Sequence, residues 1–241
     1  MLFGAAALAG GVDAIAGGGG LIAMPALLLA GIPPQAALAT NKLQGSVGTF
    51  FAARYFIRHG QVSVADIRSW ILGTFLGAVA GTALVLTLDV RQVGTILPVL
   101  LLGMALYYLL SPNLGEVDRA RRVSPAVFAG LICPLLGFYD GFFGPGTGSF
   151  MALACVTLMG HNLTRATAHT KVLNFTSNLA SLGYFLAFGE VAWLAGLVMM
   201  AGQFAGASLG ARLVIRQGAR LVRPVAVIMC VLMSARLLWR G

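Results

Sequence analysis

The sequence predicts an all-α polytopic membrane protein made of two inverted-topology repeats. Of the 241 residues, 59% are hydrophobic and only 10% are charged, whereas a soluble domain has about 25% charged residues. The lysines and arginines stand in short clusters between long apolar runs, which is the pattern that membrane topology produces. The second half also repeats the motif order of the first. We therefore attribute the net charge of +9 to topology, and we expect surrounding membrane lipid and no nucleic-acid partner.

The first repeat is predicted to cover residues 1–111 and opens with a helix pair that glycines interrupt. Its first helix, 2–16, would rise about 22 Å, less than the roughly 30 Å of a hydrocarbon core, which leaves open whether this helix is complete. Residues 21–31 are predicted as a second short helix, because Pro33 and Pro34 cannot continue it. The interruption between the two helices consists of Gly17, Gly18, Gly19 and Gly20.

Three spanning helices are predicted next, at 43–57, 70–88 and 93–110. The middle one carries Gly73, Gly77 and Gly81 at a spacing of four, which lets two membrane helices approach closely. A polar, basic linker at 112–123 then leads to the second repeat, 124–241. The repeat is visible by subtraction, because several identical residues recur 129 positions later: Lys42 and Lys171, Tyr55 and Tyr184, Gly77 and Gly206, Gly81 and Gly210. A repeat of this length spans nearly the whole chain.

The basic clusters indicate that the two repeats face opposite sides of the membrane. The loop after the first spanning helix carries three arginines in the first repeat and no Lys or Arg in the second, and the next loop reverses this bias. By the positive-inside rule the repeats are inverted, as in many secondary transporters. Inversion requires an odd number of crossings per repeat. Each glycine-broken segment therefore crosses twice or not at all, as two short helices.

Asp13 and Asp140 are the acidic residues that lie well inside apolar runs, and they occupy equivalent places. A carboxylate within a membrane is unfavourable by at least about 2.5 kcal/mol unless it is paired or hydrated. Burial disfavours the charged form, so such a group can take up and release a proton near neutral pH. One hypothesis is therefore a proton-coupling site. The other is structural, with each carboxylate capping the amides of the glycine turn that follows.

The glycine breaks are predicted to place a helix amino terminus just after Gly20 and another near Gly148. Exposed amides and the positive end of the helix dipole would form an anion site there. We expect this site to include Gly17 to Gly20 in the first break and Gly144, Gly146 and Thr147 in the second. The alternative is a tight turn where helices touch.

Lys42 and Lys171 lead into polar helix faces, which suits a small oxyanion. The predicted binding residues on these faces are Thr40, Asn41, Lys42, Thr170, Lys171, Asn174 and Asn178. The alternative is that both lysines are anchors whose ammonium groups reach the membrane interface. His169 replaces Thr40 in the repeat and is the histidine that we expect to titrate with transport.

Several function classes are disfavoured. The three cysteines are isolated in apolar segments, so we expect neither a disulfide framework nor a zinc site. No GxGxxG or P-loop pattern is present, and no nucleophile and base or HExxH arrangement suggests catalysis. We therefore predict no enzyme activity, no metal and no cofactor. No sequence pattern fixes the oligomeric state.

At these residues the chain resembles the TauE/SafE family of sulfite and organosulfonate exporters. The resemblance rests on Asp13 to Gly20 leading to Met24-Pro25-Ala26-Leu27, on Ala37 to Lys42, and on Ala166 to Lys171 in the second repeat. It implies proton-driven export of small sulfur-containing anions across a bacterial cytoplasmic membrane. The chain departs from the family pattern in its short first run and in the second break, which reads Gly-Pro-Gly-Thr-Gly.

Together these observations predict a secondary transporter that exports a small anion, such as sulfite or a short organosulfonate, by alternating access. Protons are the expected coupling ion. Two alternatives stay open: a passive anion channel, and a permease of the same fold for a different small organic anion.

Overall fold

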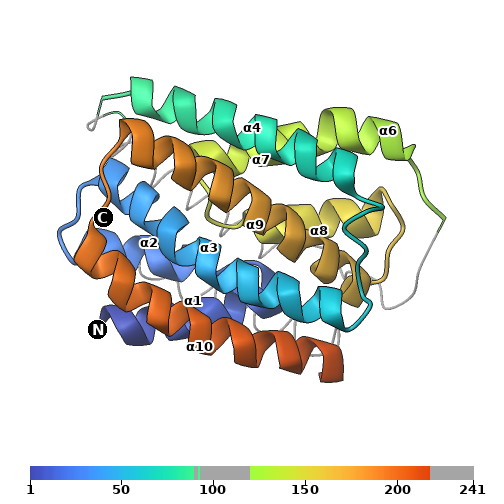
Figure 1. Cartoon of the computed structure of the whole chain (residues 1–241), viewed down its shortest axis with the longest axis horizontal. Coiled ribbons are helices and arrows are strands. Elements are labelled where there is room, and N and C mark those ends of the chain that lie inside the picture. Colours follow the sequence, from blue (N-terminus) through green and yellow to red (C-terminus); the bar gives the residue numbers. More distant parts are fainter. Residues whose placement is uncertain (90–91, 93–119, 218–241) are drawn as a thin grey trace.

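The structure is a computed structural model that describes all residues except 90–91, 93–119 and 218–241 (Figure 1). The described residues form helices and no strand, so the all-α prediction is confirmed. The predicted spanning helix at 93–110 and most of the linker at 112–123 lie outside the described residues.

The first repeat contains α1 (Leu2–Ala16), α2 (Gly20–Leu29), α3 (Pro34–Arg58) and α4 (Arg68–Thr87). The prediction of a helix at 43–57 was wrong at its start, because α3 begins nine residues earlier, at Pro34. Proline is favourable at the first helical position, where its missing N–H would have no partner and its φ is already helical. Lys42 therefore lies inside a helix and not at its entrance.

The second repeat contains α6 (Pro125–Val127), the π-helical turn η1 (Phe128–Ile132), α7 (Cys133–Phe142), α8 (Thr147–Thr157), α9 (Leu163–Phe188) and α10 (Trp193–Gln217). The first three form one continuous helical segment. Pro134 lies just after the π-helical turn, and a widened turn accommodates a proline that has no N–H and would clash with the preceding turn.

Three described helical segments are long and apolar enough to cross a membrane, namely Arg68–Thr87, Pro125–Phe142 and Trp193–Arg212. Helices α3 and α9 have 25 and 26 residues, or about 38 Å at 1.5 Å per residue, but they carry more polar side chains. Most of those polar side chains are buried in the bundle. Large apolar side chains are instead exposed on the outer helices, including Leu72 of α4, Leu135 of α7 and Leu194 of α10, as expected of surfaces that face lipid.

The helices of the two repeats are interleaved. Along the bundle α1 packs on α10, α10 on α3, α3 on α9, α9 on α4 and α4 on α7. The counterparts in the two repeats are α1 and α7, α3 and α9, and α4 and α10. Exchanging each helix for its counterpart gives the same set of contacts. In Figure 1, α3 runs from left to right and α9 from right to left, and α4 and α10 are also opposed. These directions are those that inverted repeats require, although the inversion itself stays a prediction.

The glycines at a spacing of four lie where α4 packs on α7 and where α10 packs on α1. A Cβ on Gly77 of α4 would be 2.0 Å from the carbonyl oxygen of Pro134, and a Cβ on Gly206 of α10 would be 1.9 Å from that of Ala7. Helices α4 and α10 thus pack closely on α7 and α1 of the other repeat, by the small-residue contact that brings membrane helices together.

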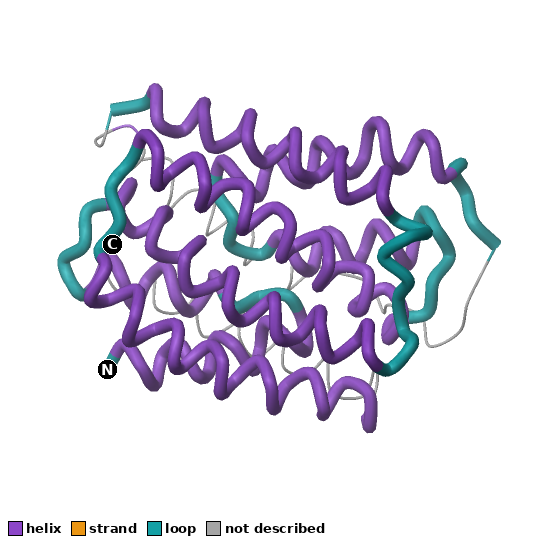
Figure 2. The backbone as a smooth tube through the Cα atoms, in the orientation of Figure 1, coloured by secondary structure: helices purple, strands orange, loops and turns teal. Residues whose placement is uncertain are grey.

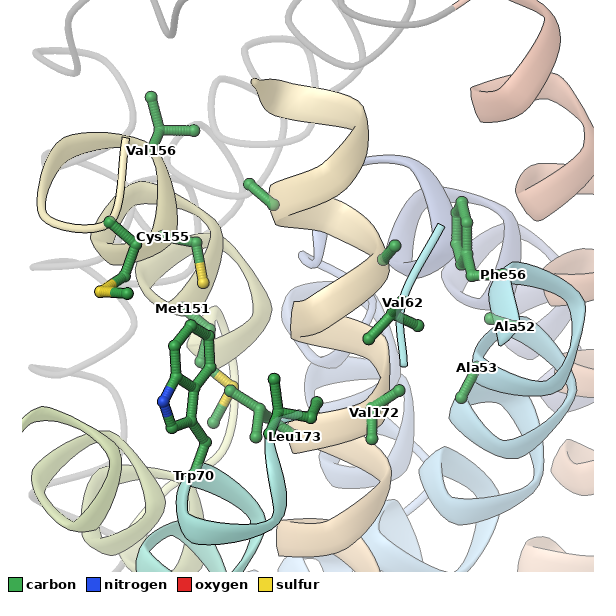
Figure 3. Close-up of a cluster of buried hydrophobic side chains, with 14 of the residues drawn as sticks. Ala52, Ala53, Phe56, Val62, Trp70, Met151, Cys155, Val156, Val172 and Leu173 are labelled. Atoms are coloured by element: carbon green, nitrogen blue, oxygen red, sulfur yellow. The ribbon is translucent and has the colours of Figure 1, made fainter. Parts of the chain in front are cut away.

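A hydrophobic core joins α4, α8 and α9 beside these contacts (Figure 3). Trp70 of α4 is its largest side chain, and its ring lies 4.5 Å from that of Phe128 between centroids. Met151 of α8 and Leu173 of α9 belong to the same cluster. This packing fixes the position of α9, which carries Lys171.

Candidate transport site

The two glycine breaks meet in the middle of the bundle, where Figure 2 shows two loop segments enclosed by helices. A Cβ on Gly17 would lie 2.4 Å from the carbonyl carbon of Gly148, and a Cβ on Gly148 would lie 2.5 Å from the Cα of Gly17. Gly17 also ends α1 in the left-handed region, at φ 74°. The breaks therefore need bare backbone because they touch each other, as the tight-turn alternative proposed.

Helices α2 and α8 begin at the breaks, within one residue of the predicted positions. Their N-cap residues are Gly19 and Gly146, and neither helix has a side-chain cap. The N-caps are therefore bare backbone, and the hydrogen bond that the structure describes for the Asp13 carboxylate comes from Lys171.

Both carboxylates instead pair with the lysine of the opposite repeat. Lys42 Nζ of α3 lies 2.9 Å from Asp140 Oδ2 of α7, and Lys171 Nζ of α9 lies 3.0 Å from Asp13 Oδ2 of α1. Each ammonium group also donates to the backbone oxygen of its aspartate. The two crossed ion pairs therefore lock the first helix of each repeat onto the central helix of the other.

The lysines are not interface anchors, because their side chains are 1% and 0% exposed. A buried ion pair is tolerated only when its charges satisfy each other and their remaining donors find acceptors. The backbone oxygens of Asp13 and Asp140 provide such acceptors. The snorkelling alternative is therefore wrong for both residues.

The two ion pairs differ in their access to solvent. The Asp13 side chain is 14% exposed, whereas that of Asp140 is 2% exposed. Asp13 Oδ2 accepts a hydrogen bond from Lys171, whereas Asp140 Oδ2 contacts Lys42 as an ion pair without a directed hydrogen bond. The structure is thus asymmetric at its centre, although the sequence motifs are repeated.

A pocket lies at this crossing, with a cavity volume of about 30 Å³, measured as the space open to the centre of a water molecule. One water needs roughly 10–15 Å³ on this measure, so the pocket has room for a small polyatomic ion. Eight of the predicted site residues line it: Asp13, Gly17, Gly20, Asn41, Asp140, Gly144, Asn174 and Asn178.

The other predicted site residues do not line the pocket: Gly18, Gly19, Thr40, Lys42, Gly146, Thr147, His169, Thr170 and Lys171. The lysines lie behind the aspartates. Lys42 is also close to Gly144, since a Cβ on that glycine would be 3.0 Å from Nζ. His169 packs against Trp70 and His161, with ring centroids 5.6 and 4.5 Å apart. Its titration with transport stays a prediction.

Four further residues line the pocket, namely Gln44, Gly45, Thr49 and Gln203. Gln44 and Thr49 belong to the polar face that follows Lys42 in the sequence, and the repeat offset points to Gly45, which is the counterpart of Asn174. Gln203 of α10 was also detectable, as a polar residue within an apolar run. Its Oε1 is held between two helices, since a Cβ on Gly10 or Gly48 would come within 2.5 or 2.6 Å of that atom.

Thr40 has a structural contact in place of a pocket position. Its hydroxyl donates to the carbonyl of Ala36 and accepts from the backbone N–H of Ala192 at 3.0 Å, just before α10 begins. We expect Thr40→Val to lower the free energy of unfolding by about 1 kcal/mol or more, because that N–H loses its partner. Thermal unfolding of the purified variant in detergent measures this loss of stability.

Thr176→Val is the matched control, because the hydrogen bond that the structure describes for the Thr176 hydroxyl stays within its own helix, to Val172. Thr40→Val should also leave anion affinity unchanged. An equal loss of stability in both variants, or a loss of affinity in the Thr40 variant, contradicts the structural assignment.

Comparison with known proteins identifies the family. Residues 2–237 match the family model described as sulfite exporter TauE/SafE. The chain belongs to the TauE/SafE family. No solved structure matches it.

The relatives of this TauE/SafE chain are also named as transporters. A probable membrane transporter protein of Haemophilus influenzae is 52% identical over 95% of this chain and 89% of its own length. The probable membrane transporter protein YfcA of Escherichia coli K12 is 51% identical over 99% of this chain and 89% of its own length. The probable membrane transporter protein YunE of Bacillus subtilis is 22% identical over 97% and 95%. With its apolar helices, this TauE/SafE protein is a multi-pass membrane transporter.

Proposed function

We propose that this protein is a secondary transporter of a small anion in the bacterial cytoplasmic membrane, working by alternating access. The observation that carries the proposal is the position of the pocket. Its lining comes from α1 and α3 of one repeat and from α7, α9 and α10 of the other. Rocking of one repeat against the other would therefore open this pocket first to one side of the membrane and then to the other.

The proposed substrate is a small sulfur-containing anion, sulfite or a short organosulfonate. The family name supports this class, and the cavity volume of about 30 Å³ favours an ion with few heavy atoms. Asn41, Asn174 and Asn178 supply amide groups in the pocket, and amide N–H groups can donate to the oxygens of such an anion. Gly20 and Gly144 bring backbone close to the same space.

Lys42 and Lys171 are the proposed source of positive charge, and Asp13 or Asp140 the proposed proton carrier. Two other functions use the same pocket. A passive channel would let the anion equilibrate without accumulating it, and a permease of this fold would accept a different small organic anion, such as a carboxylate. Export is the direction that the family name suggests.

The test is transport by the purified protein in liposomes, with sulfite, thiosulfate, sulfoacetate, taurine, sulfate and carboxylates offered in turn. We expect one sulfur-containing anion to accumulate above its equilibrium level when a pH gradient is imposed. Asn174→Leu should raise its KM about tenfold or more, since a lost hydrogen bond to a charged group is worth about 1.5–3 kcal/mol.

Ser181→Ala is the control for this variant, because Ser181 lies on the same helix and is buried but does not line the pocket. Its KM should stay at the level of the unmodified protein. Transport of no anion in the panel would refute the proposed function. Equilibration without accumulation would identify a channel, and transport of carboxylates alone would assign the other permease.

A further inference from the structure

The wall of the pocket carries two carboxylates and no cation. Asp13 and Asp140 line it, and no Lys or Arg is among its described lining residues. Lys171 and Lys42 are fully covered and touch the aspartates from behind. An anion that enters the pocket in this conformation therefore meets a carboxylate before it can reach an ammonium group.

The charges of the two aspartates and the two lysines sum to zero, so the site with both ion pairs formed offers an anion no net attraction. Like charges at close range disfavour each other, and an anion beside a charged carboxylate is unfavourable in a site of low dielectric constant. Neutralising one carboxylate changes both the net charge of the site and the repulsion of the anion. A proton on the aspartate removes the repulsion and leaves the lysine as an uncompensated cation.

That cation cannot remain alone, because Lys171 is 0% exposed. Breaking a buried ion pair from one side is strongly unfavourable, since the remaining charge has neither water nor a partner. An anion in the pocket would supply the missing partner. Protonation of the aspartate and binding of the anion therefore favour each other, and by linkage each raises the affinity for the other.

Asp13 is the carboxylate that a proton reaches first in this conformation, because its side chain is 14% exposed and that of Asp140 is 2% exposed. The ionisable side chains around it are few. Helix α2 has none, α8 contributes only Cys155, and α10 contributes only the exposed Arg212 among its described side chains. Helix α3 presents Lys42, which already pairs with Asp140, while its Arg54, Tyr55 and Arg58 lie near its carboxyl-terminal end.

Two further ionisable groups lie near the crossing, and both are turned to other partners. The Tyr139 hydroxyl of α7 donates to the backbone oxygen of Pro145, and His169 of α9 lies against Trp70 and His161. Lys171 is therefore the charged group that responds when Asp13 changes its protonation state.

We propose that Asp13 and Lys171 form a charge-exchange pair that carries one proton together with one singly charged anion. The proton binds a carboxylate oxygen of Asp13, the anion replaces that carboxylate as the counter-ion of Lys171, and on release the ion pair forms again. Lys171 keeps its proton throughout. This inference rests on the proposed function and makes transport an electroneutral proton–anion symport. An inward proton gradient would then drive uptake, and export would require a larger outward anion gradient.

The test uses the full-length protein in liposomes, with ethanesulfonate as the probe because its acid form is too strong to cross the bilayer as a neutral molecule. An inward ethanesulfonate gradient is imposed without a pH gradient, and a trapped dye reports internal pH. We expect the interior to acidify with one proton per anion. The rate should not change when potassium and valinomycin impose a membrane voltage.

Alkalinisation of the interior, or a voltage-dependent rate, would overturn the symport while leaving anion transport itself established. Absence of flux for every anion in the panel would instead refute the proposed function on which the inference rests. The two failures are therefore distinguishable.

Variants then test the assignment to Asp13. Asp13→Asn should carry ethanesulfonate without a proton, so its ratio of protons to anions in net uptake should fall from one to nearly zero and its rate should become voltage-dependent. Asp13→Glu keeps a titratable group and should keep a ratio near one at a lower rate, which also shows that the position tolerates change. Ser181→Ala, at a position that is buried on α9 and does not line the pocket, is the control and should keep a ratio near one. A ratio near one in folded Asp13→Asn, as judged by size-exclusion chromatography, would overturn the assignment.

Discussion

Replacing Lys42 by methionine is expected to lower the free energy of unfolding by about 3–5 kcal/mol, the largest effect of any single substitution at the centre of the protein. The substitution leaves the volume nearly unchanged but removes the cation that pairs with Asp140, whose side chain is 2% exposed. The carboxylate then remains in the bundle without a counter-charge or water. Chemical or thermal unfolding of the purified protein in detergent measures the loss.

The double variant Lys42→Met/Asp140→Leu separates the charge from the packing. Replacing both members of a buried ion pair by apolar residues is often neutral, so we expect the double variant to recover most of the lost stability. Lys171→Met should cost less than Lys42→Met, because Asp13 is 14% exposed and water can partly hydrate its carboxylate. Equal losses in the two lysine variants would contradict the difference in hydration, and no recovery in the double variant would show that the loss does not come from the unpaired carboxylate.

Substituting Gly17 by alanine is expected to have the second largest effect, because two unfavourable terms coincide there. The left-handed backbone at φ 74° costs a residue with a Cβ about 1–2 kcal/mol. The same Cβ would lie 2.4 Å from the carbonyl carbon of Gly148, and forced overpacking costs about 1–3 kcal/mol. We expect a total loss of about 2–5 kcal/mol, measured by unfolding in detergent.

Three other glycines separate these two terms. Gly148→Ala introduces only the clash, since its Cβ would be 2.5 Å from the Cα of Gly17. Gly31→Ala introduces only the strain, because φ is 80° and no atom lies within 4 Å of the added Cβ. Gly183→Ala in α9 introduces neither, and should be neutral or stabilising by up to about 1 kcal/mol, because alanine is the better helix former. A Gly17 variant no less stable than the Gly31 variant would contradict the contact between the breaks.

Much of the fold followed from residue patterns. Long apolar runs with little charge predicted the helices α1 and α4 within two residues of their observed ends, and the prolines and glycines predicted where α2 stops. The start of α3 was missed because Thr40, Asn41 and Lys42 are polar, so the predicted helix began after them. In the structure those side chains are buried, so polarity marked the interior of the bundle and not a loop.

The sequence predicted which types of residue form the candidate site, but it did not predict which of these residues pair with each other. Asp13, Asp140 and both lysines stood out because buried charges in a membrane are unfavourable and need a reason. The sequence could not show that each aspartate pairs with the lysine of the opposite repeat, because such a contact joins residues 98 or 158 positions apart. It also suggested that the glycines expose amides to an anion, which stays a prediction, and it could not show that Gly17 and Gly148 lie in contact.

The sequence by itself therefore determined the class of protein, the internal repeat and the residues whose burial requires explanation, because composition and periodicity are properties of the chain alone. Only the tertiary structure decided that carboxylates face the pocket while lysines lie behind them, and that Asp13 is more exposed than Asp140. Those facts depend on how two copies of one unit pack against each other, and a repeated motif carries no information about which copy is open to water.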